Sequence, residues 1–234
     1  FQKQFSWDGA AFHLDMFPII PITNPVEMDE TVTNILEKLR QDAAYRKLFS
    51  QAFEDGQVNA DNTFKAMSQF MLMMVSANSK YDKYVRVEKG GEFSEQEKKG
   101  LELFKAKCAS CHTSDLFTDD AFRNNGLPVN PEINDLGRMT VTLLEDDKYK
   151  FKVPSLRNIE LTAPYMHDGR FGSLKSVLNF YATGVQETQN LDPILKKEDG
   201  TTGISLNEQE KEDIIAFLKT LTDEEFITDK RFAE

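Results

Sequence analysis

Two cysteines and a histidine form the clearest chemical motif of this sequence, Cys108-Ala-Ser-Cys111-His112. Two thiols at this spacing can each add to one vinyl group of a porphyrin, and the adjacent imidazole can reach the iron as a ligand. The motif is therefore typical of covalent heme c attachment. It occurs once in the chain, so the sequence predicts one heme c, with His112 bound to its iron.

Two other interpretations of these residues are weaker. A structural zinc site needs four ligands, and beyond the motif the chain has only His13 and His167 as further histidines. A thioredoxin-like dithiol belongs in a strand–helix–strand setting, whereas this pair follows an amphipathic helical pattern. Heme attachment is the favoured interpretation.

Composition narrows the remaining classes of function. The 234 residues include 28 Lys and Arg against 39 Asp and Glu, which gives a net charge of −11. This balance argues against nucleic acid as a partner, because phosphate binding needs positive charge. The apolar run from Met71 to Val75 is far shorter than the roughly 18 residues of a spanning helix, so no membrane span is expected.

The elements that must position the motif are predicted to be helices joined by long loops, an all-α fold. Apolar residues recur at helical spacing over residues 30–53, as two short helices or one bent one, and again over residues 62–84. A polar stretch at residues 89–92 interrupts the pattern. It predicts a boundary between one domain at residues 1–88 and a second at residues 93–234.

Two helices of the second domain have sequence signals for their first turns. Ser94 with Glu97 has the spacing of a capping box and would open the helix that leads into the cysteines. Ser205 with Glu208 has the same spacing and would open a helix near the C-terminus. Gly100 would let these two helices cross closely, as they do in a cytochrome c domain.

A short motif near the N-terminus is repeated later in the chain. Phe5-Ser-Trp-Asp-Gly9 and Tyr165-Met-His-Asp-Gly169 both have an aromatic residue, a ring before Asp-Gly, and a leucine five residues after the glycine. The repeat predicts that the chain holds one complete unit and the end of another.

The order of these motifs resembles the bacterial di-heme cytochrome c peroxidases and their MauG-like relatives. The resemblance rests on five segments, namely Phe5–Gly9, Pro21-Ile-Thr-Asn-Pro-Val-Glu-Met28, Cys108–His112, Phe151-Lys-Val-Pro-Ser-Leu-Arg-Asn158 and Leu161-Thr-Ala-Pro-Tyr-Met-His-Asp-Gly169. Members of this family have two cytochrome c domains, each with its own heme motif. The resemblance therefore implies a cytochrome c fold with long loops over residues 93–234, and over residues 1–88 the remnant of a peroxidatic cytochrome c-like domain whose heme-binding segment is missing.

The resemblance also implies an activity. The full-length protein would hold two hemes and would reduce hydrogen peroxide to water with electrons from a small cytochrome or cupredoxin. Its compartment would be the periplasm, and a homodimer is compatible with the family. The chain as given, as a truncated form, is expected to be inactive alone. Two alternatives stay open: a mono-heme electron-transfer protein, and a MauG-like enzyme that oxidises residues of a partner protein.

Two residues of the first domain acquire catalytic roles from the resemblance. Trp7, in the Trp-Asp-Gly motif, would lie between the two hemes. Glu27, in the Asn-Pro-Val-Glu-Met segment, would be the distal carboxylate of the peroxide site. A carboxyl group there can take a proton from the near peroxide oxygen and return it to the far one, which makes water the leaving group.

The remaining expected site residues lie in the second domain. Tyr181 aligns with the sixth iron ligand of MauG-like members, and Met166 is the alternative ligand. A Tyr ligand would lower the reduction potential relative to Met. Arg157 could pair with a heme propionate. Ca²⁺ would be bound through the backbone carbonyls of Thr162 and Pro164.

Overall fold

The computed structural model describes residues 2–233 of the chain. By packing, the chain divides into two compact units. The first unit contains the residues up to Ser6 together with Ala10–Val75, and the second contains Trp7–Gly9 together with the residues from Ser76 onward.

The first unit is built from short helices. The apolar pattern predicted over residues 30–53 forms two helices, because Asp42 ends one and its carboxylate accepts a hydrogen bond from Ala44 N, 2.7 Å away, to cap the next. The elements are the 3₁₀ turn Leu14–Met16 and the helices α1 (Ile19–Thr23), α2 (Val32–Gln41), α3 (Ala43–Ala52) and α4 (Ala60–Met73).

The regular elements of the second unit are also mainly helices, with long loops and little strand, which confirms the predicted all-α class. The capping box of Ser94 and Glu97 is present and opens the helix that leads into the cysteines. The helices are α5 (Lys80–Val85), α6 (Glu95–Lys107), α7 (Met139–Thr142), α8 (Leu174–Asn179), a π-helix (Phe180–Gly184), α9 (Glu208–Lys219) and α10 (Glu224–Ile227), with 3₁₀ turns at Glu145–Asp147, Ile159–Leu161 and Pro193–Leu195. Two short strands, β1 (Phe122–Arg123) and β2 (Phe151–Lys152), pair antiparallel.

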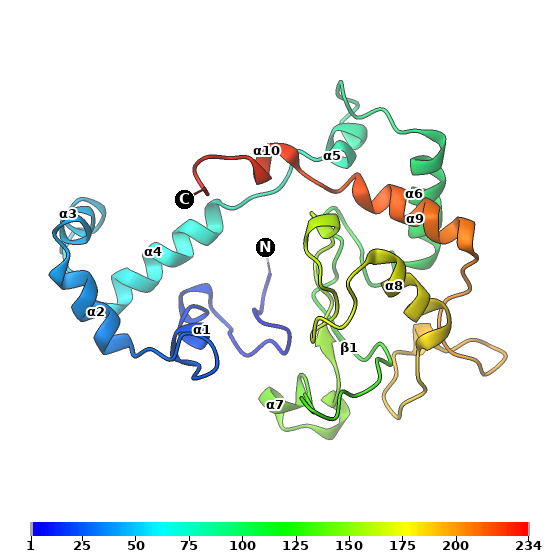
Figure 1. The fold of residues 1–234 in the computed structure, drawn as a ribbon, viewed down its shortest axis with the longest axis horizontal. Coiled ribbons are helices and arrows are strands. Elements are labelled where there is room, and N and C mark those ends of the chain that lie inside the picture. Colours follow the sequence, from blue (N-terminus) through cyan, green and yellow to red (C-terminus); the bar gives the residue numbers. More distant parts are fainter. Residues whose placement is uncertain (1, 234) are drawn as a thin grey trace. The chain divides into compact units, whose positions relative to one another are not determined.

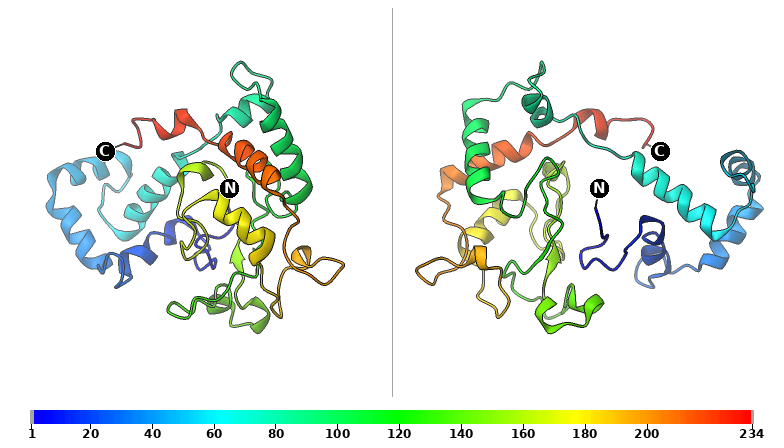
Figure 2. Two further views of the ribbon diagram at one scale, coloured as in Figure 1. Left: turned by 45° about the vertical axis from the view of Figure 1, so that its right-hand side comes forward. Right: turned by 180° about the vertical axis from the view of Figure 1, so that it is seen from behind.

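Helices α6 and α9 lie side by side in every view and form the centre of the second unit (Figures 1 and 2). Ile214 and Phe217 of α9, and Leu221 just after its end, belong to the core of this unit and have no solvent exposure. A Cβ atom added to Gly100 would lie 1.9 Å from the carbonyl oxygen of Asp213, so this close crossing needs a glycine, as the sequence predicted.

The predicted start of α9 is wrong by two residues. The capping box is formed by Asn207 and Glu210, not by Ser205 and Glu208, and the helix begins after Asn207. Asparagine caps a helix as well as serine does. Leu206 packs against the core before the helix begins, so the loop extends further than the sequence pattern indicated.

Helix α5 packs within the second unit. The ring of Tyr84 stacks on Phe93 with centroids 4.1 Å apart, and the edge of Tyr81 meets Phe117 at 5.0 Å. The division by packing therefore falls after Val75. The sequence-based boundary lies later, at the polar stretch between α5 and α6.

The internal repeat has the same backbone in both copies. Each copy closes with an antiparallel bridge between residues six apart, Phe5 with Ala11 and Tyr165 with Phe171. Equivalent positions have matching φ angles, +72° at Ser6 and +71° at Met166, and +73° at Gly9 and +68° at Gly169. The repeat is therefore structural, because a left-handed backbone at equivalent positions sets the shape of both turns.

Candidate functional site

A cavity of about 360 Å³ opens in the second unit, beside α6, α8 and α9. Its volume is in the range of sites that hold small molecules and cofactors. Most of the wall is apolar, with contributions from Phe104, Val153, Leu156, Leu178, Ile214 and Leu218. Cys108, Cys111 and His112 line the same cavity.

The end of α6 presents the motif residues to this cavity. Cys108 is the C-cap of the helix, and its carbonyl oxygen accepts hydrogen bonds from the N–H groups of Cys111 and His112 at 3.2 and 3.0 Å. This tight turn sets the positions of the three residues. Both cysteines are free thiols.

The imidazole of His112 is arranged as a metal ligand. Its Nδ1 lies 3.0 Å from the carbonyl oxygen of Phe117. A carbonyl can only accept, so Nδ1 holds the proton and the lone pair of Nε2 is left for a metal. Burial lowers the pKa of His112, although hydrogen bonds to backbone carbonyls oppose the shift. The ring is therefore neutral at physiological pH, as iron coordination requires.

The thiols do not suit a zinc site or a dithiol reagent. Burial raises the pKa of Cys108 to about 12, and it also raises the pKa of Cys111. Both thiols are therefore protonated at neutral pH, so neither is a reactive dithiol nucleophile. Within residues 2–233 there is also no group of three or more His, Cys, Asp or Glu side chains placed to hold a metal ion.

Both expected sixth ligands line the cavity that contains His112. Tyr181 belongs to the π-helix that continues α8, and its carbonyl accepts a hydrogen bond from Ile204 N at 2.7 Å. A π-turn changes the direction in which a side chain projects, and such turns are frequent at functional sites. Met166 is in the second copy of the repeated turn.

One asparagine contacts both candidates. Asn125 Nδ2 is 3.4 Å from the hydroxyl oxygen of Tyr181 and 3.8 Å from the sulfur of Met166. Burial raises the pKa of Tyr181, and the hydrogen bond from Asn125 opposes this shift. The sequence analysis missed Asn125, because it lies in a long loop with no periodicity or motif.

These features fit heme c. The apolar cavity would enclose the porphyrin, the two thiols that line it would form the thioether bonds, and the free Nε2 of His112 would offer a lone pair to iron. A phenol or a thioether is available as the second axial ligand.

Comparisons with known proteins identify the family. The family model "Di-haem cytochrome c peroxidase" matches residues 1–90, and the model "Cytochrome c" matches residues 97–222. A solved structure of a MauG-like protein associated with microbial copper homeostasis superposes with a TM-score of 0.84 at 32% identity, over 99% of this chain and 75% of that one. The chain belongs to the family of di-heme cytochrome c peroxidases and MauG proteins. The resemblance read from the motifs is thus confirmed.

Two curated relatives show both branches of the family. The methylamine utilization protein MauG of Methylorubrum extorquens is 35% identical over 93% of this chain and 60% of its own length. The cytochrome c551 peroxidase of Nitrosomonas europaea is 34% identical over 92% of this chain and 60% of its own. The chain thus spans about 60% of the length of these relatives. The diheme peroxidase BthA of Burkholderia thailandensis, at 23% identity and a TM-score of 0.78, shares the fold.

The family's two expected catalytic residues lie in different units. Trp7 lines the cavity, is 41% exposed, and its carbonyl accepts a hydrogen bond from Lys152 N at 2.8 Å. Glu27 is exposed on the turn after α1, where Asn24 Nδ2 donates to its Oε1 at 2.7 Å. Every residue that lines the cavity belongs to the second unit, so Glu27 is not one of them.

Arg157 makes an ion pair instead of lining the cavity. Its two terminal nitrogens each donate to one oxygen of Asp82 at 2.9 Å, and both side chains are largely buried. Burial acts to raise the pKa of Asp82, but hydrogen bonds from Arg157 and Ser79 outweigh it and lower the pKa. Arg157 Nε is buried without a hydrogen-bond partner in the described part of the chain.

Two residues expected to bind Ca²⁺, and one charged residue that the sequence did not indicate, lie on the cavity wall. Thr162 and Pro164, expected to bind Ca²⁺ through their carbonyls, both line it. The sequence analysis did not find Arg123, which is held by Asp119 at 2.6 Å and Asp192 at 2.5 Å. Arg123 and Asp192 form a polar part of the wall near the cysteines.

Proposed function

We propose that this chain is part of a periplasmic di-heme peroxidase that reduces hydrogen peroxide to water with electrons from a small cytochrome or cupredoxin. The peroxidase relatives support this activity. Within residues 2–233, no helix is long and apolar enough to cross a membrane. One heme c would be bound by this chain, and the second heme of the proposed di-heme protein would be bound by a segment not included in it.

The observation that carries the proposal is the pairing of His112 with Tyr181 or Met166 in one cavity. When bound, heme c supplies one-electron redox chemistry. His112 would bind the iron, and Tyr181 or Met166 would be a second protein ligand from the same cavity. An iron held by two protein side chains would transfer electrons without binding peroxide, so we assign this site to electron entry.

Trp7 and Glu27 would serve the peroxide side. The exposed indole of Trp7 forms one edge of the cavity, where it can carry electrons toward the other heme. The carboxylate of Glu27, fixed by Asn24, would move a proton between the two peroxide oxygens. Ca²⁺ at the carbonyls of Thr162 and Pro164 is part of the same proposal.

The first test is the heme content of this chain. Expressed with heme-maturation machinery, it is expected to give one covalent heme per polypeptide in a pyridine hemochrome assay. Cys108→Ser together with Cys111→Ser should abolish covalent attachment. Ser110→Ala, which keeps both thiols, is the matched control and should load fully. Two hemes per chain, or loading of the double Cys variant, would contradict the proposal.

A second function is favoured by one observation. The chain is 35% identical to a MauG protein, and the resemblance implies that Tyr181 would be the iron ligand, as in MauG-like members. An enzyme that oxidises residues of a partner protein is therefore the alternative activity. Trp7 is the single Trp of the chain, which offers few aromatic relays for such a route.

Rapid peroxide turnover by the full-length protein with a reduced cytochrome, without a protein substrate, would favour the peroxidase. A full-length protein with no second heme motif would favour the mono-heme electron carrier.

A further inference from the structure

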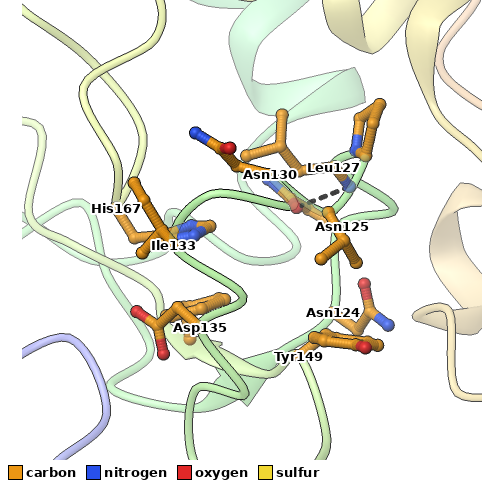
Figure 3. A pocket seen from close by; sticks show the side chains of 11 residues that line it. Asn124, Asn125, Leu127, Asn130, Ile133, Asp135, Tyr149 and His167 are labelled. Carbon is orange, nitrogen blue, oxygen red and sulfur yellow. Dashed lines mark hydrogen bonds between the residues drawn. The ribbon is translucent and has the colours of Figure 1, made fainter.

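Asn125 occupies a wall between two cavities. It lines the large cavity described above and a second, smaller one that includes Asn124, Asn130, Ile133, Tyr149 and His167 (Figure 3). Its loop follows β1 directly. The side chain of Asn125 therefore forms part of the wall of the proposed heme site.

The orientation of the Asn125 amide is fixed from the backbone. Leu127 N–H donates to Asn125 Oδ1 at 3.2 Å, the bond drawn between these residues in Figure 3. Because the oxygen is engaged in this turn, the nitrogen faces the large cavity. Nδ2 can only donate, so the group that meets Tyr181 and Met166 is a hydrogen-bond donor.

Tyr181 and Met166 differ in strength as hydrogen-bond acceptors for this donor. A thioether sulfur is a weak acceptor, whereas a phenolate oxygen is an anionic one, and hydrogen bonds to ionised acceptors are about twice as strong as neutral ones. Across residues 2–233, the hydroxyl of Tyr181 has this donor beside it but no acceptor for its own proton. Burial of Tyr181 favours the protonated phenol, and the donor of Asn125 is the group that acts in the opposite direction, toward the anionic oxygen.

We propose that Asn125 selects Tyr181 over Met166 as the sixth iron ligand, by donating a hydrogen bond to the phenolate oxygen. In the heme-loaded protein Tyr181 would bind as the phenolate, and its proton would pass to solvent. This inference rests on the proposed heme c at His112. Asn125 is a positioning residue, because it acts on the ligand and not on the iron.

The test compares ligation in heme-loaded, full-length variants by electron paramagnetic resonance, resonance Raman spectroscopy and redox titration. Asn125→Leu removes the donor and should lower the ratio of Tyr-ligated to other ferric species by roughly 10- to 100-fold. The reduction potential should rise, because an anionic ligand is lost. Asn130→Leu, in the same loop but without contact to Tyr181, is the matched control and should leave both quantities unchanged.

A double variant separates ligand selection from general disturbance of the pocket. Asn125→Leu combined with Tyr181→Phe should match Tyr181→Phe alone, because the donor then has no phenolate to stabilise. An additional change in the double variant would overturn the inference. So would retention of Tyr ligation in Asn125→Leu with an unchanged or lower potential, or methionine ligation in the unsubstituted protein.

Failure of this inference can be distinguished from failure of the proposed heme site. Covalent heme content is measured for every variant, and its absence from the unsubstituted protein would refute the heme proposal itself. Normal heme content together with unchanged ligation in Asn125→Leu would refute only the role of Asn125. Peroxide turnover does not enter the comparison.

Discussion

The crossing of α6 and α9 gives the most direct test of the packing. Gly100→Ala would place a Cβ atom 1.9 Å from the carbonyl oxygen of Asp213 and 2.8 Å from Cβ of Phe217. Ordinary contact is about 3.4 Å or more, so the two helices would have to separate by more than an ångström. The obstructing atoms include backbone, which cannot rotate out of the way as a side chain can.

The expected cost follows from two opposing contributions. Alanine is favoured over glycine inside a helix by about 1 kcal/mol. Overpacking of a core costs about 1–3 kcal/mol, and contact with backbone places this case at the upper end. We therefore expect Gly100→Ala to lower the free energy of unfolding by about 2 kcal/mol. For a chain of this size that corresponds to a fall in Tm of about 4–8 °C.

Thermal unfolding followed by circular dichroism on the heme-loaded protein measures this change. Gly172→Ala is the matched control, because a Cβ atom there meets nothing within 4 Å. We expect the control to stay within about 0.5 kcal/mol of the unsubstituted protein. A Gly100→Ala protein that melts at or above the temperature of the control would refute the close crossing.

Four further substitutions address the site and the buried ion pair. Glu27→Gln in the full-length protein should lower peroxide turnover by roughly 10²- to 10⁴-fold in a steady-state assay with reduced cytochrome, and unchanged turnover would remove Glu27 from the mechanism. Tyr181→Phe should change the ferric spectrum and raise the reduction potential, whereas Met166→Leu should do neither; the opposite result would make Met166 the ligand. Asp82→Asn should destabilise the fold by about 3 kcal/mol at pH 7, because Arg157 loses its anion. Since the pKa of Asp82 is lowered in the folded protein, this contribution is present above the unfolded pKa of about 4 and is lost as pH falls through the folded value. Urea unfolding at several pH values should therefore show a difference that shrinks in acid, and a constant difference would contradict the ion-pair argument.

The sequence predicted those parts of the structure that depend on local patterns. The spacing of Cys108, Cys111 and His112 indicated the heme site, and the cavity in the structure contains all three. Gly100 indicated the helix crossing, and a capping box correctly located the start of α6. These signals are local because each depends on residues a few positions apart.

Features that depend on long-range packing were not predictable in this way. Asn125 meets Tyr181 across 56 positions of sequence, and only the folded loop brings them together. Arg157 pairs with Asp82 across 75 positions, so its partner could not be read from its own segment. The start of α9 was misplaced for a related reason, since packing of Leu206 decides where the loop ends.

The repeated turn has a consequence for which side chains this chain can present from it. Both copies hold a ring one position before Asp-Gly on the same left-handed backbone, an indole at Trp7 and an imidazole at His167. In the second copy the ring of His167 stacks on Phe151 at 3.7 Å, so the side chain is supported from outside the turn. The backbone of the repeated turn thus fixes where a ring is placed, and the residue type at that position decides whether the ring is an indole or an imidazole. An indole and an imidazole therefore stand at equivalent positions of the two copies without any difference in the turn that presents them.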